Sequence, residues 1–154
     1  MARVGDPAPD FELAGDDGDV HRLADLRGQW VVLAFYPGDF TPVCTRQFCS
    51  YRDAADRLDE LDAVVLGISP QSVSSHERFR DEYDLTVPLL ADSERLAVRA
   101  YGVVRAGLVR RSIFIIDPEG IIRYRHTATL GLRYKDVEDL AGALEEARTR
   151  AAAV

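Results

Sequence analysis

The chain has 154 residues, of which 47% are hydrophobic and 29% charged, and its formal net charge is -7. These values are typical of a water-soluble protein with one hydrophobic core, so we expect a single domain over residues 1–154 and no basic surface for nucleic acid. The longest apolar run, residues 30–36, is too short to cross a bilayer, and the first ten residues lack the apolar segment of a secretory signal, which together predict a cytoplasmic protein with reduced thiols.

The first half of the chain alternates predicted strands and helices. A Gly-Asp-Asp-Gly turn between short apolar segments predicts a β-hairpin over residues 11–23. The apolar run at residues 30–36 is continuous rather than alternating, which is typical of a strand covered on both faces. The elements expected next are a long helix from about residue 42 that includes Ala55 and Leu58, a strand at residues 63–68, and a helix with Val73, Phe79 and Tyr83 on one face.

The second half predicts a short strand, a helix, a second hairpin and a final helix. The strand is expected at residues 87–90 and the helix from Asp92 through Ala100. The hairpin is expected at residues 113–124, with a turn at 117–120. The final helix carries an apolar stripe formed by Val137, Leu140, Ala141, Leu144 and Ala147. Parallel βαβ units in the middle and an antiparallel hairpin near the end indicate a mixed sheet between helical layers. We therefore predict an α/β protein with a thioredoxin-like mixed sheet flanked by helices and an N-terminal β-hairpin.

Cys44 lies at the predicted start of the helix that follows the first buried strand. Thr41 suits the N-cap position, where its hydroxyl would accept an amide hydrogen bond, and Pro42 suits the first helical position. Val43 and Cys44 then occupy the second and third positions. The sulfur would lie among unpaired N–H groups at the positive end of the helix dipole, which favours a reactive thiolate. A small buried core residue is an equally good interpretation of this pattern.

Cys49 is the only other cysteine in the chain. On an ideal helix it lies ~140° around and ~7.5 Å along the axis from Cys44, on the side of Arg52 and Asp53, and hence nearer solvent. The Cα atoms would be roughly 8–9 Å apart, beyond the usual disulfide range of about 4.4–6.8 Å. A bond between the two cysteines would require the helix to unwind, and an incidental surface thiol is the alternative.

Three sequence features resemble one family. They are Pro37-x-x-x-Thr41-x-x-Cys44, the segment Arg111-Ser-Ile-Phe-Ile-Ile-Asp117, and Cys44-x-x-x-x-Cys49 followed by Ser-Tyr-Arg-Asp. The first two resemble the active-site motif and the later arginine-bearing strand of peroxiredoxins, the AhpC/TSA superfamily. The third is similar to the bacterioferritin-comigratory, or Q-type, branch. The order of elements fits this family from about residue 3 to residue 148.

The resemblance implies roles for the residues of the cysteine motif. Cys44 would be the peroxidatic nucleophile. Thr41 would orient the thiolate and the peroxide through its hydroxyl, and Pro37 would shield the thiolate from water.

The resemblance also implies roles for residues outside that motif. Arg111, rather than its neighbour Arg110, would hold the thiolate in its charged form and polarise the peroxide. Gln47 would support this arginine, with Val43 beside it as a further supporting residue. Cys49 would be the resolving thiol.

The activity implied by the resemblance is thiol-dependent reduction of hydrogen peroxide and organic hydroperoxides, without a metal or another cofactor. Cys44 would become a sulfenic acid, and Cys49 would condense with it to an intramolecular disulfide. An external dithiol or low-molecular-weight thiol, such as thioredoxin, would reduce that disulfide. Because an intact helix separates the thiols, we expect local unfolding near residues 44–49. No nucleic-acid or membrane partner is expected, and the protein would be a monomer or weak homodimer.

Three alternatives stay open at this point. Cys49 could be silent in a single-cysteine peroxidase. A thiol–disulfide oxidoreductase normally has Cys-x-x-Cys, whereas this chain has Gln47 in the third position. A non-catalytic binding or chaperone module would leave the motif unexplained. His21, His76 and His126 show no ligand spacing, so no metal site is predicted, and His76 is interpreted as a packed or half-exposed helix residue.

Overall fold

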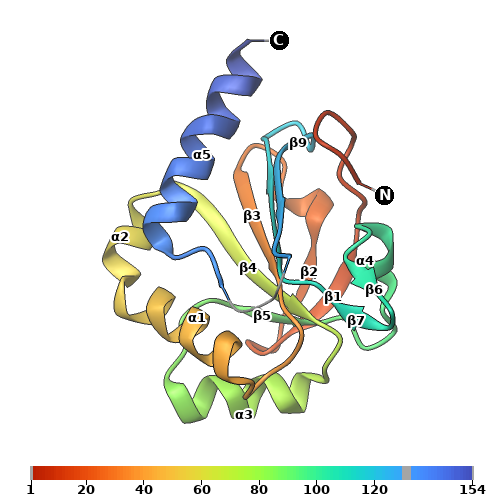
Figure 1. The fold of residues 1–154 in the computed structure, drawn as a ribbon, viewed down its shortest axis with the longest axis vertical. Helices are drawn as coiled ribbons and strands as arrows, with labels where there is room; N and C mark the ends of the chain where they lie inside the picture. The colour runs from red at the N-terminus through yellow and green to blue at the C-terminus, as the bar shows by residue number, and fades with distance from the viewer. Residues whose placement is uncertain (1, 130–132, 154) are drawn as a thin grey trace.

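A mixed seven-stranded sheet runs through the molecule in the order β2-β1-β5-β4-β3-β8-β9 (Figure 1). The computed structural model describes residues 2–129 and 133–153. The strands of this sheet are β1 (Glu12–Gly15), β2 (Val20–Arg22), β3 (Trp30–Phe35), β4 (Ala63–Ser69), β5 (Leu89–Ala91), β8 (Ser112–Ile116) and β9 (Ile122–Thr127). The α-helices are α1 (Pro42–Asp53), α2 (Ala55–Asp59), α3 (Val73–Tyr83), α4 (Leu96–Ala100) and α5 (Val137–Ala152), and a 3-10 turn covers Leu23–Leu26.

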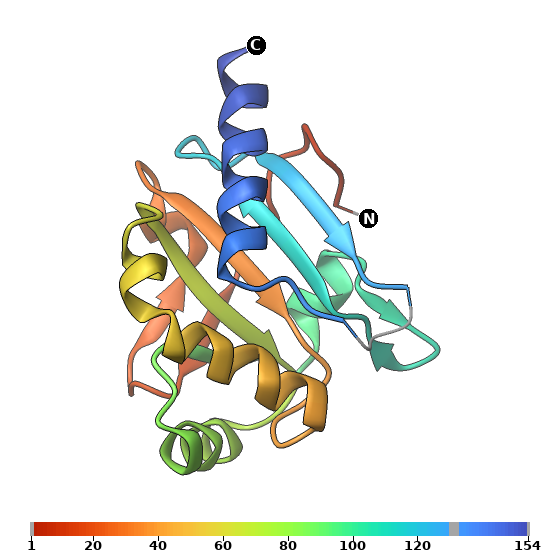
Figure 2. The ribbon, with the colours of Figure 1, turned by 60° about the vertical axis from the view of Figure 1, so that its left-hand side comes forward.

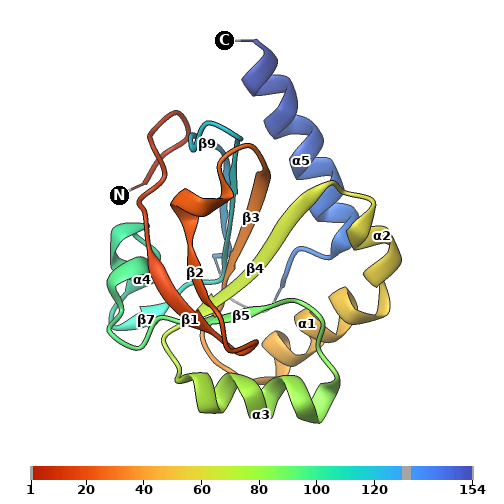
Figure 3. The same cartoon turned by 180° about the vertical axis from the view of Figure 1, so that it is seen from behind.

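The centre of the sheet has the predicted thioredoxin-like topology. Strands β3, β4 and β5 are parallel, whereas β8 pairs with β3 and with β9 in the antiparallel sense. Helices α1, α3 and α5 contribute to the core on one face, while α4 and the N-terminal segment cover the other (Figures 2 and 3). Every residue from Val31 to Phe35 is buried, which confirms that the continuous apolar run marks a strand covered on both faces.

Both predicted hairpins are confirmed. Strand β1 pairs antiparallel with β2, and Leu13 lies opposite His21. Between β8 and β9, the Asp117 carboxylate accepts hydrogen bonds from the main-chain N–H groups of Glu119 at 3.0 Å and Ile121 at 2.9 Å. The side chain of the first turn residue therefore fixes the loop that reverses the chain.

The first long helix is shorter than predicted. It ends at Asp53, and Ala54 departs from helical geometry with φ -108° and ψ 29°, so the segment with Ala55 and Leu58 forms the separate helix α2. The segment predicted as one helix is thus two helices. On α5, Ala141 is only half-buried and Ala143 occupies the buried stripe instead.

Two boundaries in the second half also differ from the prediction, and one hairpin is additional. Strand β5 begins at Leu89, after Pro88, which cannot donate a ladder hydrogen bond. Helix α4 begins at Leu96 rather than at Asp92. The Asp92 carboxylate nevertheless accepts from the N–H groups of Ala97 at 3.2 Å and Val98 at 2.8 Å, so it satisfies the first turn from outside the helix. The two-residue strands β6 (Val104–Arg105) and β7 (Leu108–Val109) form a small hairpin that the sequence analysis did not predict.

Within the described part of the chain, no helix is both long enough and apolar enough to cross a bilayer. The single-domain span 1–154, the cytoplasmic location and the oligomeric state stay predictions.

Candidate active site

The turn between β3 and α1 places Cys44 at the predicted position. Thr41 is the extended N-cap residue of α1, with φ -71° and ψ 148°, and Pro42 occupies the first helical position. Cys44 is therefore the third residue of the helix, and its side chain is fully buried. The free N–H groups of the first turn and the helix dipole both face this region, which favours negative charge on the sulfur.

The Thr41 hydroxyl does not have the expected hydrogen bond. No side chain caps the amides of α1. Instead, Thr41 Oγ1 donates to the main-chain carbonyl of Gly38 at 2.9 Å, and the Thr41 carbonyl accepts from Thr45 N. The hydroxyl is thus turned back toward the loop, three residues earlier in the chain. The geometry couples Thr41 to the loop instead of to the helix amides.

Arg111 lies beside the buried thiol. It directly precedes β8, and the antiparallel register of β3 with β8 pairs Phe35 with Ser112, so the start of β8 lies at the end of β3. The Nη1 and Nη2 atoms of Arg111 each donate to Cys44 Sγ at 3.3 Å. The side chain of the neighbouring Arg110 points elsewhere and donates to the carbonyl of Ala128. A buried guanidinium thus directs two hydrogen bonds at one sulfur.

A chain of hydrogen bonds holds Arg111 in this position. Arg111 Nη1 donates to Gln47 Oε1 at 2.6 Å, Gln47 Nε2 donates to the Tyr51 hydroxyl at 2.9 Å, and that hydroxyl donates to the Lys135 carbonyl at 2.6 Å. Burial raises the pKa of Tyr51 well above its usual range, so its hydroxyl keeps its proton and acts as a donor. Because the Gln47 carboxamide is thereby oriented, its carbonyl oxygen faces the arginine.

Cys49 lies in the same unbroken helix as Cys44. Both cysteines are free thiols, and Cys49 is half-buried against the core on which α1 packs. The prediction that Cys49 is nearer solvent than Cys44 is confirmed. Because α1 continues to Asp53, a bond between the two sulfurs requires the helix to open.

The other two predicted site residues, Pro37 and Val43, lie near the start of α1. Pro37 is exposed in the loop between β3 and α1, and Val43 is half-buried in the first turn of the helix. Arg111 also lines an open groove of about 970 Å³, together with Gln47, His126, Lys135 and other residues. Burial, followed by the positive charge of Lys135, lowers the pKa of His126 below its usual value.

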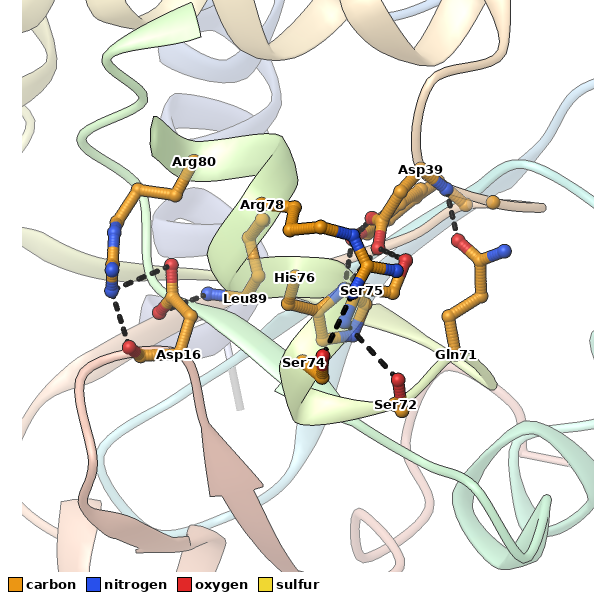
Figure 4. A network of polar contacts seen from close by, with 12 residues as sticks. Asp16, Asp39, Gln71, Ser72, Ser74, Ser75, His76, Arg78, Arg80 and Leu89 are labelled. Carbon is orange, nitrogen blue, oxygen red and sulfur yellow. Dashed lines mark hydrogen bonds and ion pairs between the residues drawn. The ribbon is translucent and has the colours of Figure 1, made fainter. Parts of the chain in front are cut away.

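A buried polar cluster that the sequence did not predict lies behind the same loop. Asp39 and His76 are both fully buried, and their side chains meet at 2.7 Å between Oδ2 and Nδ1 (Figure 4). His76 is therefore not the half-exposed helix residue that was one of the two interpretations. The only sequence signal was that a histidine occupied the apolar stripe of its helix. Across residues 2–129 and 133–153, no group of three or more His, Cys, Asp or Glu side chains is arranged to hold a metal ion.

The chain is similar to known proteins of one family. Residues 4–125 match the AhpC/TSA family. The chain is 40% identical over 125 residues to peroxiredoxin Bcp of Bacillus subtilis, which covers 76% of this chain and 80% of that protein. It is 42% identical over 127 residues to the putative peroxiredoxin bcp of Coxiella burnetii, covering 77% of this chain and 84% of that one. The crystal structure of peroxidoxin BcpB from Mycobacterium tuberculosis has a TM-score of 0.81 at 30% identity, covering 97% of this chain and 98% of that one.

Proposed function

The chain belongs to the AhpC/TSA family and is a peroxiredoxin, a thiol-dependent peroxidase, and from this premise we propose that Cys44 attacks the peroxide and Cys49 resolves the product. The observation that carries the proposal is the pair of donors from Arg111 to the buried sulfur of Cys44, each at 3.3 Å. A structural cysteine in a core is neutral and gains little from a guanidinium with two donors, whereas the negative charge of a nucleophilic thiolate is stabilised by it.

The first step is a two-electron oxidation of sulfur. The Cys44 thiolate attacks the terminal oxygen of a hydroperoxide, the S–O bond forms as the O–O bond breaks, and the leaving alkoxide or hydroxide takes up a proton. Negative charge moves from sulfur toward the leaving oxygen in the transition state. Arg111 and the free amides at the start of α1 lie where they can stabilise that charge without reorganising. Thr41 orients the peroxide through its hydroxyl, Pro37 shields the thiolate from water, and Val43 is a supporting residue.

Gln47 is proposed as a positioning residue for this step. It accepts from Arg111 at 2.6 Å and is itself fixed by Tyr51, so the guanidinium has one preferred orientation. A group held in place before the reaction stabilises the transition state more than a mobile one.

The second step joins the two cysteines of α1. The Cys49 thiolate attacks the Cys44 sulfenic acid, the S–S bond forms, and the hydroxide that leaves is protonated to water. An external dithiol, for which a thioredoxin-type protein is our candidate, then reduces the disulfide by two exchange steps. Since a helix separates the sulfurs, we propose that the segment 44–49 unwinds before the bond closes.

The proposal is tested by intact mass measurement. Fully reduced protein is mixed briefly with one equivalent of hydrogen peroxide and quenched with a thiol alkylator. Loss of both alkylatable thiols with a mass lower by two hydrogens is the expected result. One added oxygen with one surviving thiol would contradict the role of Cys49 and favour a single-cysteine peroxidase. An unreacted Cys44 would overturn the assignment of the nucleophile.

A matched variant separates the two cysteines. Cys49→Ser should leave the first oxidation of Cys44 at its normal rate and stop turnover with a dithiol reductant. Sustained turnover by Cys49→Ser would remove Cys49 from the mechanism.

Unwinding is tested by amide hydrogen exchange on the reduced and oxidised forms. Residues 42–53 should exchange faster in the oxidised protein, while α5 serves as an internal control whose protection stays the same. Equal protection of α1 in both forms would refute the unwinding step.

A further inference from the structure

A buried ionisable cluster anchors the loop that leads into α1. The carboxylate of Asp39 accepts from the Tyr36 hydroxyl at 2.7 Å and from Ser75 Oγ at 2.7 Å, and it meets His76 Nδ1 at 2.7 Å (Figure 4). The main-chain N–H of Asp39 donates to Gln71 Oε1. The side chain and the backbone of Asp39 are thus both bonded to α3 or to the residues just before it.

The protons of this cluster follow from its partners. His76 Nε2 faces the Leu90 carbonyl at 3.1 Å, which can only accept, so Nε2 carries a hydrogen. Burial, followed by the Asp39 carboxylate, raises the pKa of Tyr36 well above its usual value, and its hydroxyl is therefore a donor to Asp39. His76 Nδ1 and Asp39 Oδ2 share one hydrogen bond of 2.7 Å. The loop is consequently tied to α3 and to β5 by a pair that water does not reach.

Stability alone is a weak reason for such a pair. Burying two ionisable groups costs desolvation free energy, and well-packed apolar residues often do as well or better. What a buried, fully paired group does provide is one fixed geometry for the backbone next to it. The pair therefore matters for the backbone geometry of the residues adjacent to Asp39.

Both neighbours of Asp39 matter to the site. Before it, the Gly38 carbonyl accepts from Thr41 Oγ1 at 2.9 Å. After it, Phe40 has φ 66°, a left-handed conformation that a bulky side chain rarely adopts, and its ring packs against Phe79. Such a conformation persists only where the surroundings hold it. The anchored Asp39 lies between these two constraints, so it sets the direction of the Gly38 carbonyl.

We propose that Asp39 and His76 are positioning residues for the reaction with peroxide, and that they act through the Gly38 carbonyl on the hydroxyl of Thr41. The inference rests on the proposed function, in which Thr41 orients the peroxide at Cys44. If the anchor is lost, the Gly38 carbonyl turns, the Thr41 hydroxyl loses its acceptor, and the peroxide is no longer aligned with the sulfur. The contact of Arg111 with Cys44 does not pass through this loop and stays intact.

The chain supplies a matched control at the other end of α3. Asp16 is as buried as Asp39, accepts from Leu89 N at 3.1 Å and lies 3.9 Å from Arg80, and within the described residues neither partner is hydrogen-bonded to the loop (Figure 4). Asp16→Asn therefore removes a buried carboxylate of the same kind without disturbing Thr41.

The experiment compares the rate of Cys44 oxidation by hydrogen peroxide with its rate of alkylation by iodoacetamide, both in single-turnover reactions. Asp39→Asn should slow oxidation by about tenfold to a hundredfold, the usual consequence of a misaligned reactant, while alkylation changes less than about twofold. Asp16→Asn should leave both rates within about twofold. A general loss of structure would instead change the oxidation rate and the alkylation rate together, and that result would overturn the proposal.

A double-mutant cycle tests whether the effect passes through Thr41. In a Thr41→Val background, Asp39→Asn should cost little further, because the group it positions is already absent. Additive effects would overturn the proposal. Should Asp39→Asn fail to fold, Ser75→Ala removes a single hydrogen bond from the same carboxylate, and it should slow oxidation by about threefold to tenfold with alkylation unaffected; an unchanged oxidation rate would count against the anchor. A wild-type Cys44 that ignores peroxide would overturn the proposed function itself, not this inference.

Discussion

Replacing Arg111 by glutamine is the most direct test of the electrostatics of this site. Arg111 is 5% exposed and places two N–H donors at 3.3 Å from Cys44 Sγ. Glutamine is a shorter polar side chain than arginine. It carries no charge and has only one donor group. The substitution therefore removes positive charge and the fork while it keeps most of the packing.

The expected magnitude follows from those contacts. Removing one preorganised donor from a developing oxyanion typically costs about 10²–10³ in rate. Arg111→Gln removes a charged donor pair from the sulfur and from the path of the leaving oxygen. We therefore expect the second-order rate constant for Cys44 oxidation to fall by about 10²–10³-fold. Arg111→Lys keeps the charge without the fork, and its rate constant should lie between those of glutamine and the native residue.

The assay is rapid mixing with hydrogen peroxide, an alkylating quench and mass analysis of the reduced fraction. Arg110→Gln is the control, because the Arg110 side chain bonds to the Ala128 carbonyl and not to the thiol. It should react within about twofold of the native protein. A loss of less than about fivefold in Arg111→Gln, or an equal loss in both variants, would refute the reasoning that the fork activates the thiolate.

Three further predictions address packing and protonation. Tyr51→Phe removes a 2.6 Å donor to a main-chain carbonyl and leaves the Gln47 amide without its 2.9 Å acceptor, so urea unfolding should show a loss of about 1–3 kcal/mol; an unchanged midpoint would contradict this. Gly67→Ala would bring its new Cβ to 2.9 Å from two carbons of the Phe48 ring, and the denaturation midpoint should fall by the equivalent of about 1–3 kcal/mol with an unchanged slope, whereas a gain in stability would show that the ring can move. Burial lowers the pKa of His126 below 6.5 in the folded chain, so the unfolded chain takes up this proton first and stability is lost as the pH falls through that value. His126→Gln should flatten the dependence of unfolding free energy on pH between about 7.5 and 5.5, and an equal slope in both proteins would exclude this contribution.

Much of the active site could be predicted from local sequence. Thr41 and Pro42 mark the start of a helix because an N-cap residue and a proline at the first position each satisfy a requirement of that one turn. The position of Cys44 then follows by counting. The hydrogen bond of the Thr41 hydroxyl could not be predicted, because a hydroxyl can donate or accept and the outcome depended on the Gly38 carbonyl, whose direction the loop sets.

The contact of Arg111 with the thiol required more than local pattern. The resemblance to peroxiredoxins favoured Arg111 over Arg110, and the register of β3 with β8 brings Arg111 to the sulfur. A shift of one residue would have exchanged the two side chains between opposite faces of the sheet. Arg110 and Arg111 carry the same side chain, so side-chain chemistry does not distinguish them.

The pairing of Asp39 with His76 joins residues that are 37 positions apart. The local sequence around either residue does not predict this pairing, since a histidine in an apolar stripe is typical of an ordinary core position.

By itself, the sequence determined the features that arise within a few neighbouring residues. These are the buried strand at 30–36, the helix start at Thr41, the turn at 117–120 and the place of Cys44 in its helix. They are local because hydrophobic period, capping and turn geometry each act within one or two turns of chain. The contacts of Arg111 with the thiol, of the Thr41 hydroxyl with the Gly38 carbonyl and of His76 with the Asp39 carboxylate arise in the folded chain. Those contacts depend on strand register and on how α3 docks against the sheet, and the packing of the whole core sets both.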